Sequence, residues 1–196
     1  MPPLPILIIP ILAVILVPLL WVVVQYNSLV SLRNYISESW SNVDAELKRR
    51  YELIPNLVAT VKVYATHERN VLERVVELRN RCLANNGSPG DQARDETQLV
   101  DALKSLIVVV ESYPQLKADQ HFLKLQQELV NTENRIQAAR RFYNGNIRDY
   151  RNKCESFPSN LIAGMFGFQA HEFFSVSPSV QAVPDVEFGE ANPGGR

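Results

Sequence analysis

The residues that could carry chemistry in this sequence are few, with three histidines and two cysteines in 196 residues. Metal sites inside helical bundles use Glu-x-x-His pairs on two helices, and the sequence contains no Glu-x-x-His. His67 precedes Glu68, but adjacent positions point in different directions around a helix, so this dipeptide is not a ligand pair. His121 and His171 have no suitably spaced partner either. We therefore expect no metal site.

The two cysteines do not have the surroundings of a catalytic nucleophile, which needs a nearby base and an electropositive setting. Cys82 and Cys154 lie on apolar helical stripes, where a thiol packs as a small hydrophobic group. A disulfide between them is an alternative if the body faces an oxidising compartment. The sequence also lacks a phosphate-binding loop and a dinucleotide fingerprint. We therefore predict a non-enzymatic protein without a cofactor; the alternative is an enzyme whose unfamiliar pocket gathers His67, Glu68 and Glu133.

Charged side chains interrupt or border the apolar stripes of the expected helices at Arg33, Arg50, Glu68, Glu133 and Arg140. Burying a charge without a partner is costly, so these groups should pair across helices or border a hydrated groove. Pairing would fix the register of the helices, as polar positions do in coiled-coil cores. The alternative is a groove in which the same side chains bind a small ligand or a peptide.

The overall composition narrows the class of protein. The 20 Lys and Arg residues are balanced by 21 Asp and Glu residues, a formal net charge of -1. A general nucleic-acid binder would instead concentrate basic residues on one face, so we expect no nucleic-acid partner. Two cysteines are too few for a disulfide-rich scaffold or a four-thiolate zinc site.

The N-terminal part of the chain predicts a membrane span. Residues 4–24 read LPILIIPILAVILVPLLWVVV and contain no charge. As a helix this run reaches roughly 30 Å, the thickness of the hydrocarbon core of a bilayer. Trp21 and Tyr26 lie near its end, where aromatic rings favour the headgroup layer. We predict that residues 1–25 are an uncleaved transmembrane anchor in contact with the lipid bilayer. A cleaved signal peptide is the alternative, but no basic residue precedes the run and no small-x-small site follows it.

The distribution of basic residues around the span predicts its orientation. None precedes the span, whereas Arg33 follows it and Lys48, Arg49 and Arg50 come later. The positive-inside rule then favours a single-pass protein of the bacterial inner or plasma membrane, with its C-terminal body in the cytoplasm.

The body of the chain, residues 26–176, predicts helices. Apolar residues recur at steps of three and four from Leu29 to Ile54, and the pattern resumes beyond Pro55 as far as Cys82. Pro55 should mark a kink or a short break, followed by a long second helix. Turn-forming residues at 85–91 separate it from a third helix, which should stop before Tyr113-Pro114.

A fourth, long helix runs from the region of Phe122 to Cys154 and ends at Phe157-Pro158. Helices with one apolar face and short connections bury these faces best side by side. The fold class expected is therefore all-α: an N-terminal transmembrane helix, then an elongated antiparallel bundle of about four helices with coiled-coil-like packing.

An apolar segment follows the fourth helix, from Phe157 to Phe168. Its aromatic side chains should fold onto the end of the bundle. The alternative is a surface that contacts lipid or a partner protein. The residues concerned are Leu161, Ile162, Met165, Phe166 and Phe168. Residues 177–196 are rich in proline and glycine and are predicted to be disordered.

A family resemblance rests on a series of short blocks in the chain. They are Tyr26-Asn27, Leu32-Arg33-Asn34, Trp40-Ser41, Leu47-Lys48-Arg49-Arg50, Leu53-Ile54-Pro55-Asn56-Leu57-Val58, Tyr113-Pro114, Thr132-Glu133-Asn134-Arg135-Ile136, Phe157-Pro158-Ser159-Asn160 and Phe166-Gly167-Phe168. In this order they strongly resemble the LemA family of bacterial membrane proteins, over about residues 26 to 174. The resemblance implies one membrane helix followed by a helical bundle, and no established catalytic activity. Its relatives include a protein linked to magnetosome membrane biogenesis, which implies a membrane-shaping or scaffolding role.

These observations lead to one functional hypothesis and one alternative. The hypothesis is a membrane-anchored, non-enzymatic helical bundle that acts as a scaffold, an adaptor or a membrane-organising protein. Its partners would be the bilayer and either copies of itself or other membrane proteins. The alternative is a sensor module that binds a ligand or a peptide through the charged residues on the stripes.

Overall fold

The computed structural model describes the backbone of residues 4–175 and the side chains from residue 12 onward. All regular structure in this range is helical, which confirms the all-α fold class. The helices are α1 (Leu4–Tyr64), α2 (Arg69–Ala84), α3 (Pro89–Glu111), α4 (Pro114–Lys117), α5 (Gln120–Glu155) and α6 (Ser159–Met165). The predicted disordered tail, residues 177–196, lies outside the described residues.

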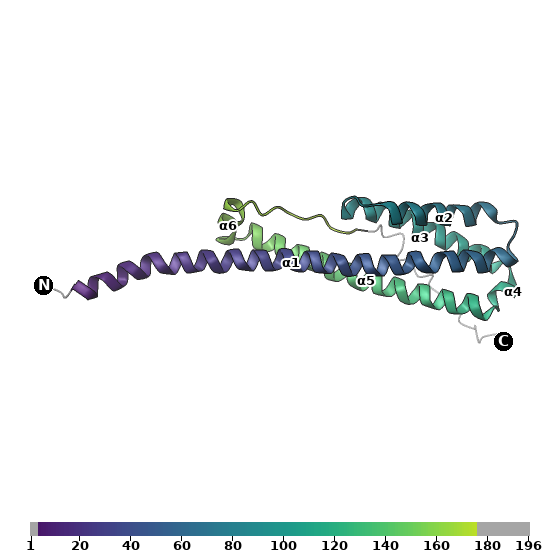
Figure 1. Cartoon of the computed structure of the whole chain (residues 1–196), viewed down its shortest axis with the longest axis horizontal. Coiled ribbons are helices and arrows are strands. Elements are labelled where there is room, and N and C mark those ends of the chain that lie inside the picture. Colours follow the sequence, from purple (N-terminus) through teal and green to yellow (C-terminus); the bar gives the residue numbers. More distant parts are fainter. Residues whose placement is uncertain (1–3, 176–196) are drawn as a thin grey trace, which may run out of the picture.

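The first helix is 61 residues long and contains both the apolar run and the first helix of the body. Its N-terminal part projects well beyond the other helices (Figure 1). The side chains from residue 12 to residue 20 are all exposed, although they are apolar. In the described part of the chain, α1 is the one helix whose length and hydropathy suit a membrane crossing. The structure therefore contains the candidate N-terminal transmembrane helix that the sequence predicts.

Of the kink or short break predicted at Pro55, the break is wrong, because α1 continues through this residue and ends only at Tyr64. Proline has no N–H to donate to the carbonyl four residues earlier, which here belongs to Tyr51. Arg79 of α2 supplies the missing donor, with its Nε 3.1 Å from the Tyr51 carbonyl oxygen. The helix thus stays continuous because a neighbouring helix satisfies the freed carbonyl group.

The second helix of the body is consequently shorter than predicted. The chain turns at residues 65–68, and α2 has 16 residues instead of extending from residue 58 to residue 82. The third helix ends at Glu111, before Tyr113-Pro114, as the sequence predicts. α4 is a single turn that leads into the long α5.

The helices form an elongated antiparallel bundle, as predicted (Figure 1). α1 and α5 run side by side in opposite directions along the whole body. α2 and α3 form a hairpin that packs against the half of α1 farther from the N-terminus. Seven-residue steps separate Leu29, Ile36 and Val43, which are all buried against the neighbouring helices. This spacing is the seam of a left-handed, coiled-coil-like packing.

The far end of the bundle is held by Asp119, the N-terminal cap of α5. Its carboxylate accepts a hydrogen bond from the backbone N–H of Phe122, at 2.9 Å, and one from the Tyr64 hydroxyl, at 3.0 Å. These two hydrogen bonds lower the pKa of the Asp119 carboxyl. The start of α5 is thereby tied to the end of α1.

The half of the body nearer the apolar run is covered by the return segment, residues 169–175. Phe174 is fully buried, and its ring lies against Trp40 with the ring centroids 5.5 Å apart. The Asn144 side chain donates to the Phe174 carbonyl and accepts from its N–H, both at 3.0 Å. The Tyr143 hydroxyl donates to the Glu172 carbonyl at 3.0 Å. The return segment therefore closes the groove between α1 and α5 where α2 and α3 do not reach.

The Arg79→Ala variant should be less stable by about 1–2 kcal/mol, because the Tyr51 carbonyl then loses its donor. In a Pro55→Ala background the backbone N–H of residue 55 can donate to the Tyr51 carbonyl. The Arg79→Ala substitution should then lower the free energy of unfolding by less. Urea unfolding of the full chain in mild detergent, followed by circular dichroism, measures both differences. The matched control is Arg74→Ala on the same helix, whose ion pair with Glu77 lies on the surface and should contribute little. Equal losses from Arg79→Ala in the two backgrounds would contradict this explanation of Pro55.

Candidate functional site

Two of the five charged candidates meet in a buried cluster where α1, α3 and α5 come together. The Arg50 side chain is only 3% exposed. Its Nη1 lies 3.2 Å from Oε2 of Glu96 on α3, and its Nη2 lies 3.3 Å from Oε2 of Glu133 on α5. One guanidinium group therefore connects three helices through two carboxylates.

The Glu96 carboxylate has further hydrogen-bond donors in the same cluster. The Tyr51 hydroxyl donates to Glu96 Oε1, and the Cys82 thiol is also hydrogen-bonded to this carboxylate. Burial, together with the negative charge of Glu96, raises the pKa values of both Tyr51 and Cys82. Both groups consequently stay protonated and act as donors, and the Cys82 thiol is not activated as a nucleophile. Cys82 and Cys154 are both free thiols.

Burial dominates the electrostatics of Glu96. It raises the pKa of the Glu96 carboxyl, although the Arg50 guanidinium and the hydrogen bonds from Tyr51 and Cys82 act in the opposite direction. Glu133 differs because its side chain is 30% exposed and reaches water. The Arg50 Nε has no hydrogen-bond partner among the described residues. This cluster is built to hold helices together, because its charges face one another instead of an opening.

Sequence reasoning missed Glu96, the most buried carboxylate of the cluster. The signal was present in the spacing, because Glu96 lies three residues before Leu99 and so continues the apolar stripe of α3. An acid at a stripe position needs a buried cation nearby. Only the fold identifies that cation as Arg50.

The other three charged candidates lie elsewhere along the bundle. Glu68 accepts a hydrogen bond from the Tyr113 hydroxyl at 3.4 Å, near the end of α1. Arg33 lies over the ring of Phe168, 5.7 Å from its centroid, at the opposite end of the body. Arg140 is half-buried on α5 and forms none of the ion pairs found among the described residues. Apart from the paired Arg50 and Glu133, the candidates thus occupy separate places, and the five do not line one groove.

The residues of the alternative enzyme hypothesis are also separated. His67 is exposed in the turn after α1, Glu68 contacts Tyr113, and Glu133 is paired with Arg50. Among the described residues, no three His, Cys, Asp or Glu side chains gather in a group that could hold a metal ion. A groove of about 660 Å³ lies between α1 and α2, and its lining includes Val58, Leu72 and Val76. Arg50 and Glu133 do not line it.

A second feature is the apolar segment at the end of α5, residues 157–168, which we call the α6 cap. Ile162 and Ala163 are buried against the bundle, so Ile162 belongs to the packing face of the cap. Phe157 and Met165 are 81% and 77% exposed, and Leu161 and Phe166 are also exposed. One face of the segment therefore packs against the bundle, as one alternative expects. The other face is exposed and remains available for the contact with lipid or a partner that the second alternative expects.

The α6 cap packs against α1 just after the apolar run. The ring centroid of Tyr26 lies 4.9 Å from that of Phe166 and 5.7 Å from that of Phe168. These edge-to-face contacts place the cap beside Tyr26. The aromatic pair that the sequence suggests for the membrane exit, Trp21 and Tyr26, therefore lies next to the cap.

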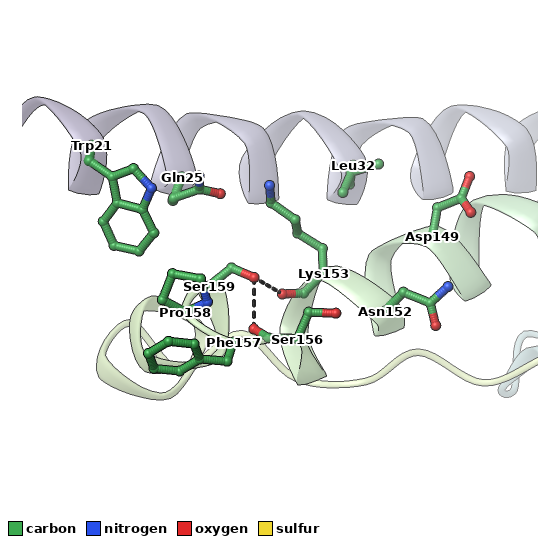
Figure 2. A pocket seen from close by; sticks show the side chains of 10 residues that line it. All are labelled: Trp21, Gln25, Leu32, Asp149, Asn152, Lys153, Ser156, Phe157, Pro158 and Ser159. Carbon is green, nitrogen blue, oxygen red and sulfur yellow. Dashed lines mark hydrogen bonds between the residues drawn. The ribbon is translucent and has the colours of Figure 1, made fainter.

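A groove of about 400 Å³ separates α1 from the corner between α5 and α6 (Figure 2). Trp21, Phe157 and Pro158 line one end of it, and Asp149 and Asn152 line the other. The Lys153 side chain extends across the groove toward α1 in Figure 2. The Ser159 hydroxyl holds the corner through contacts with the carbonyl oxygens of Lys153, at 2.7 Å, and Ser156, at 2.9 Å. The groove thus has its aromatic residues at the end nearer the apolar run and its acidic residue, Asp149, at the far end.

The fold and these features define an all-α protein with a candidate N-terminal transmembrane helix and a helical bundle. The LemA family matches this chain over residues 39–188. The chain therefore belongs to the LemA family.

Individual relatives of this chain share about a quarter of its residues over the matched region. A magnetosome protein, MamQ 2 of Paramagnetospirillum magneticum, is 24% identical over 180 residues, covering 79% of this chain and 66% of its own length. MamQ of Magnetospirillum gryphiswaldense is 23% identical with the same coverage. The protein LemA of Metamycoplasma hominis is 25% identical over 138 residues, covering 70% of this chain and 63% of its own length. The chain thus spans just under two thirds of the length of the relatives it matches.

Removing the cation of the buried cluster should be strongly destabilising. In Arg50→Met the Glu96 carboxylate loses its buried cation, which should cost about 3–5 kcal/mol at neutral pH. The folded-state pKa of Glu96 then rises further above its unfolded value, so this loss should shrink as the pH falls toward that value. Urea unfolding between neutral and acidic pH measures this trend.

Two further variants make the test specific. Arg50→Met combined with Glu96→Gln should recover much of the loss and remove its pH dependence, because no buried charge is left unpaired. Lys48→Met, on the same helix, removes only a surface ion pair with Asp44 and should change little. A pH-independent loss in Arg50→Met would contradict the assigned role of Glu96.

Proposed function

We propose that this LemA-family chain is a non-enzymatic, membrane-anchored scaffold or membrane-organising protein of a bacterial inner or plasma membrane. The observation that carries the proposal is the continuity of α1 from the apolar run into the core of the bundle. In this proposal residues 1–25 are the anchor and residues 26–176 are the bundle domain. The boundary between them lies inside one helix, so no flexible linker separates them.

A continuous helix transmits its orientation from the membrane to the body. From residue 26 to its end at Tyr64, α1 extends roughly 60 Å at about 1.5 Å per residue. α5 is packed along this length, which stiffens the rod. Such an arrangement suits a protein that presents a surface at a fixed distance and angle from the bilayer.

The charged candidates support a structural role over a sensor or catalytic role. Two of the candidates, Arg50 and Glu133, form an ion pair that the buried Glu96 completes, and Cys82 is held protonated. A ligand or peptide sensor would need these groups to face an open groove. Their mutual pairing favours the scaffold over the sensor alternative.

The relatives add modest support at the level of the family. Two of them are named magnetosome proteins, and we extend to this chain only a role in organising a membrane. Partners would be copies of the chain or other membrane proteins. The basic residues that follow the span, beginning with Arg33, favour a body on the cytoplasmic side.

The anchor is tested by placing charge in the apolar run. Leu16→Lys with Leu19→Lys should release the chain from membranes during alkaline carbonate extraction, because each lysine costs about 2.5–3.5 kcal/mol in the bilayer centre. The control pair, Leu123→Lys with Val130→Lys, alters exposed residues of α5 and should leave the chain in the membrane fraction. Release of the wild-type chain would contradict the anchor. So would a molecular mass of the purified protein that shows the first two dozen residues to be missing.

The scaffold role is tested by in-cell cross-linking of the full chain combined with its mass in mild detergent. We expect either a defined oligomer or a reproducible membrane-protein partner. A second readout is the partner's yield with the Arg50→Met variant, which loosens the bundle but keeps the anchor. A chain that is monomeric at every concentration and cross-links to no partner would remove the support for a scaffold.

A further inference from the structure

We propose that the α6 cap is a second membrane contact, with the side chains of Phe157, Leu161, Met165 and Phe166 inserted into the interfacial layer of the leaflet from which α1 emerges. This inference rests on the proposed anchor. It goes beyond the anchor because it assigns a lipid-binding surface to the end of the folded body.

The depth of the cap is set by its contacts with α1. The continuously apolar run ends at Val24, and a helix of residues 4–24 just fills the hydrocarbon core. Phe166 and Phe168 meet the ring of Tyr26 edge to face, while Phe157 and Pro158 line a groove with Trp21. With the run in the bilayer, the cap must lie at the boundary between acyl chains and headgroups.

The composition of the cap suits that location. Residues 156–170 contain no charged side chain, although Phe157, Leu161, Met165 and Phe166 are exposed. Ile162 and Ala163 are buried against the bundle and Phe166 also contacts Tyr26, so Phe157, Leu161 and Met165 are not needed for packing. An exposed apolar patch of this kind marks a binding surface, and its continuity with the span identifies the lipid as the occupant.

The aromatic and acidic residues of the groove in Figure 2 are separated along the same axis. Trp21 and Phe157 line its end nearer the span, and Asp149 and Asn152 line its far end. Arg33, the first charged residue after the span, lies over the Phe168 ring. Charged groups thus begin where the headgroup and water layers would begin.

The cap is fixed to the body, so its exposed face has a defined direction. The Phe168 N–H donates to the Ala163 carbonyl at 3.0 Å, and Gly167 adopts a left-handed conformation with φ of 69° that turns the chain back. The return segment is then held by Asn144 and Tyr143. A rigid second contact would fix the rotation of the bundle about α1, which a single span leaves free.

The experiment places a photoreactive diazirine amino acid at single positions of the full chain in vesicles of phosphatidylethanolamine and phosphatidylglycerol. The probe positions are Leu161 and Met165 in the cap, Leu16 in the span, and Val108 on α3 as an exposed apolar control at the far end. We expect phospholipid adducts at Leu16, Leu161 and Met165, and several-fold fewer at Val108.

The outcomes separate the two proposals. Adducts at Leu16 without adducts at Leu161 and Met165 would overturn the cap contact and leave the anchor intact. No adduct at Leu16 would overturn the anchor itself. Adducts between two protein chains at Leu161 or Met165 would overturn the lipid assignment, because the cap would then be a protein interface.

A charge-insertion variant checks the same surface independently. Leu161→Asp with Met165→Asp alters only exposed side chains, so the helical circular dichroism should be unchanged. With the probe at Phe157, phospholipid adducts should fall several-fold. The matched control, Val63→Asp with Val108→Asp, alters equally exposed residues far from the cap and should leave the adducts unchanged. Undiminished adducts in the cap variant would contradict the proposal.

Discussion

The other helices of this protein are arranged around a single unbroken helix, α1. One helix provides the apolar run, the partner for α5 and the surface on which α2 and the α6 cap pack. Proline at position 55 would ordinarily interrupt it, because it leaves the Tyr51 carbonyl without a donor. The Arg79 side chain replaces that donor, so the integrity of the longest helix depends on a tertiary contact.

The buried ion cluster and the coiled-coil seam act on the same bundle in different ways. Apolar stripes bring helices together, but they tolerate sliding along a repeat. Arg50 reaches Glu96 and Glu133 at one axial position, and a shifted register would leave these charges buried without partners. A single register of the helices therefore pairs all the charges of the cluster.

The two ends of the bundle differ in a way that matches a membrane protein. At the far end Asp119 and Tyr64 join α5 to α1 by polar contacts. At the other end the contacts are aromatic, and an uncharged cap lies beside Tyr26. With the span in the bilayer, the apolar end of the bundle would lie at the membrane surface and the polar end would lie far from it. The proposed scaffold would need this difference between its two ends in order to face a lipid surface at one end and partners at the other.

The helical class, the candidate span and the end of α3 could be predicted from the sequence, because periodicity, an uncharged run and a proline are local signals. The sequence also marked Arg50 and Glu133 as charges that needed partners. It could not determine that α1 passes through Pro55, that Glu96 completes the cluster, or that the return segment closes the groove. These outcomes depend on donors and acceptors far apart in the chain, such as Arg79 and Tyr51, or Asn144 and Phe174. Only the tertiary structure decides them, since a hydrogen bond across helices leaves no periodic pattern in the sequence.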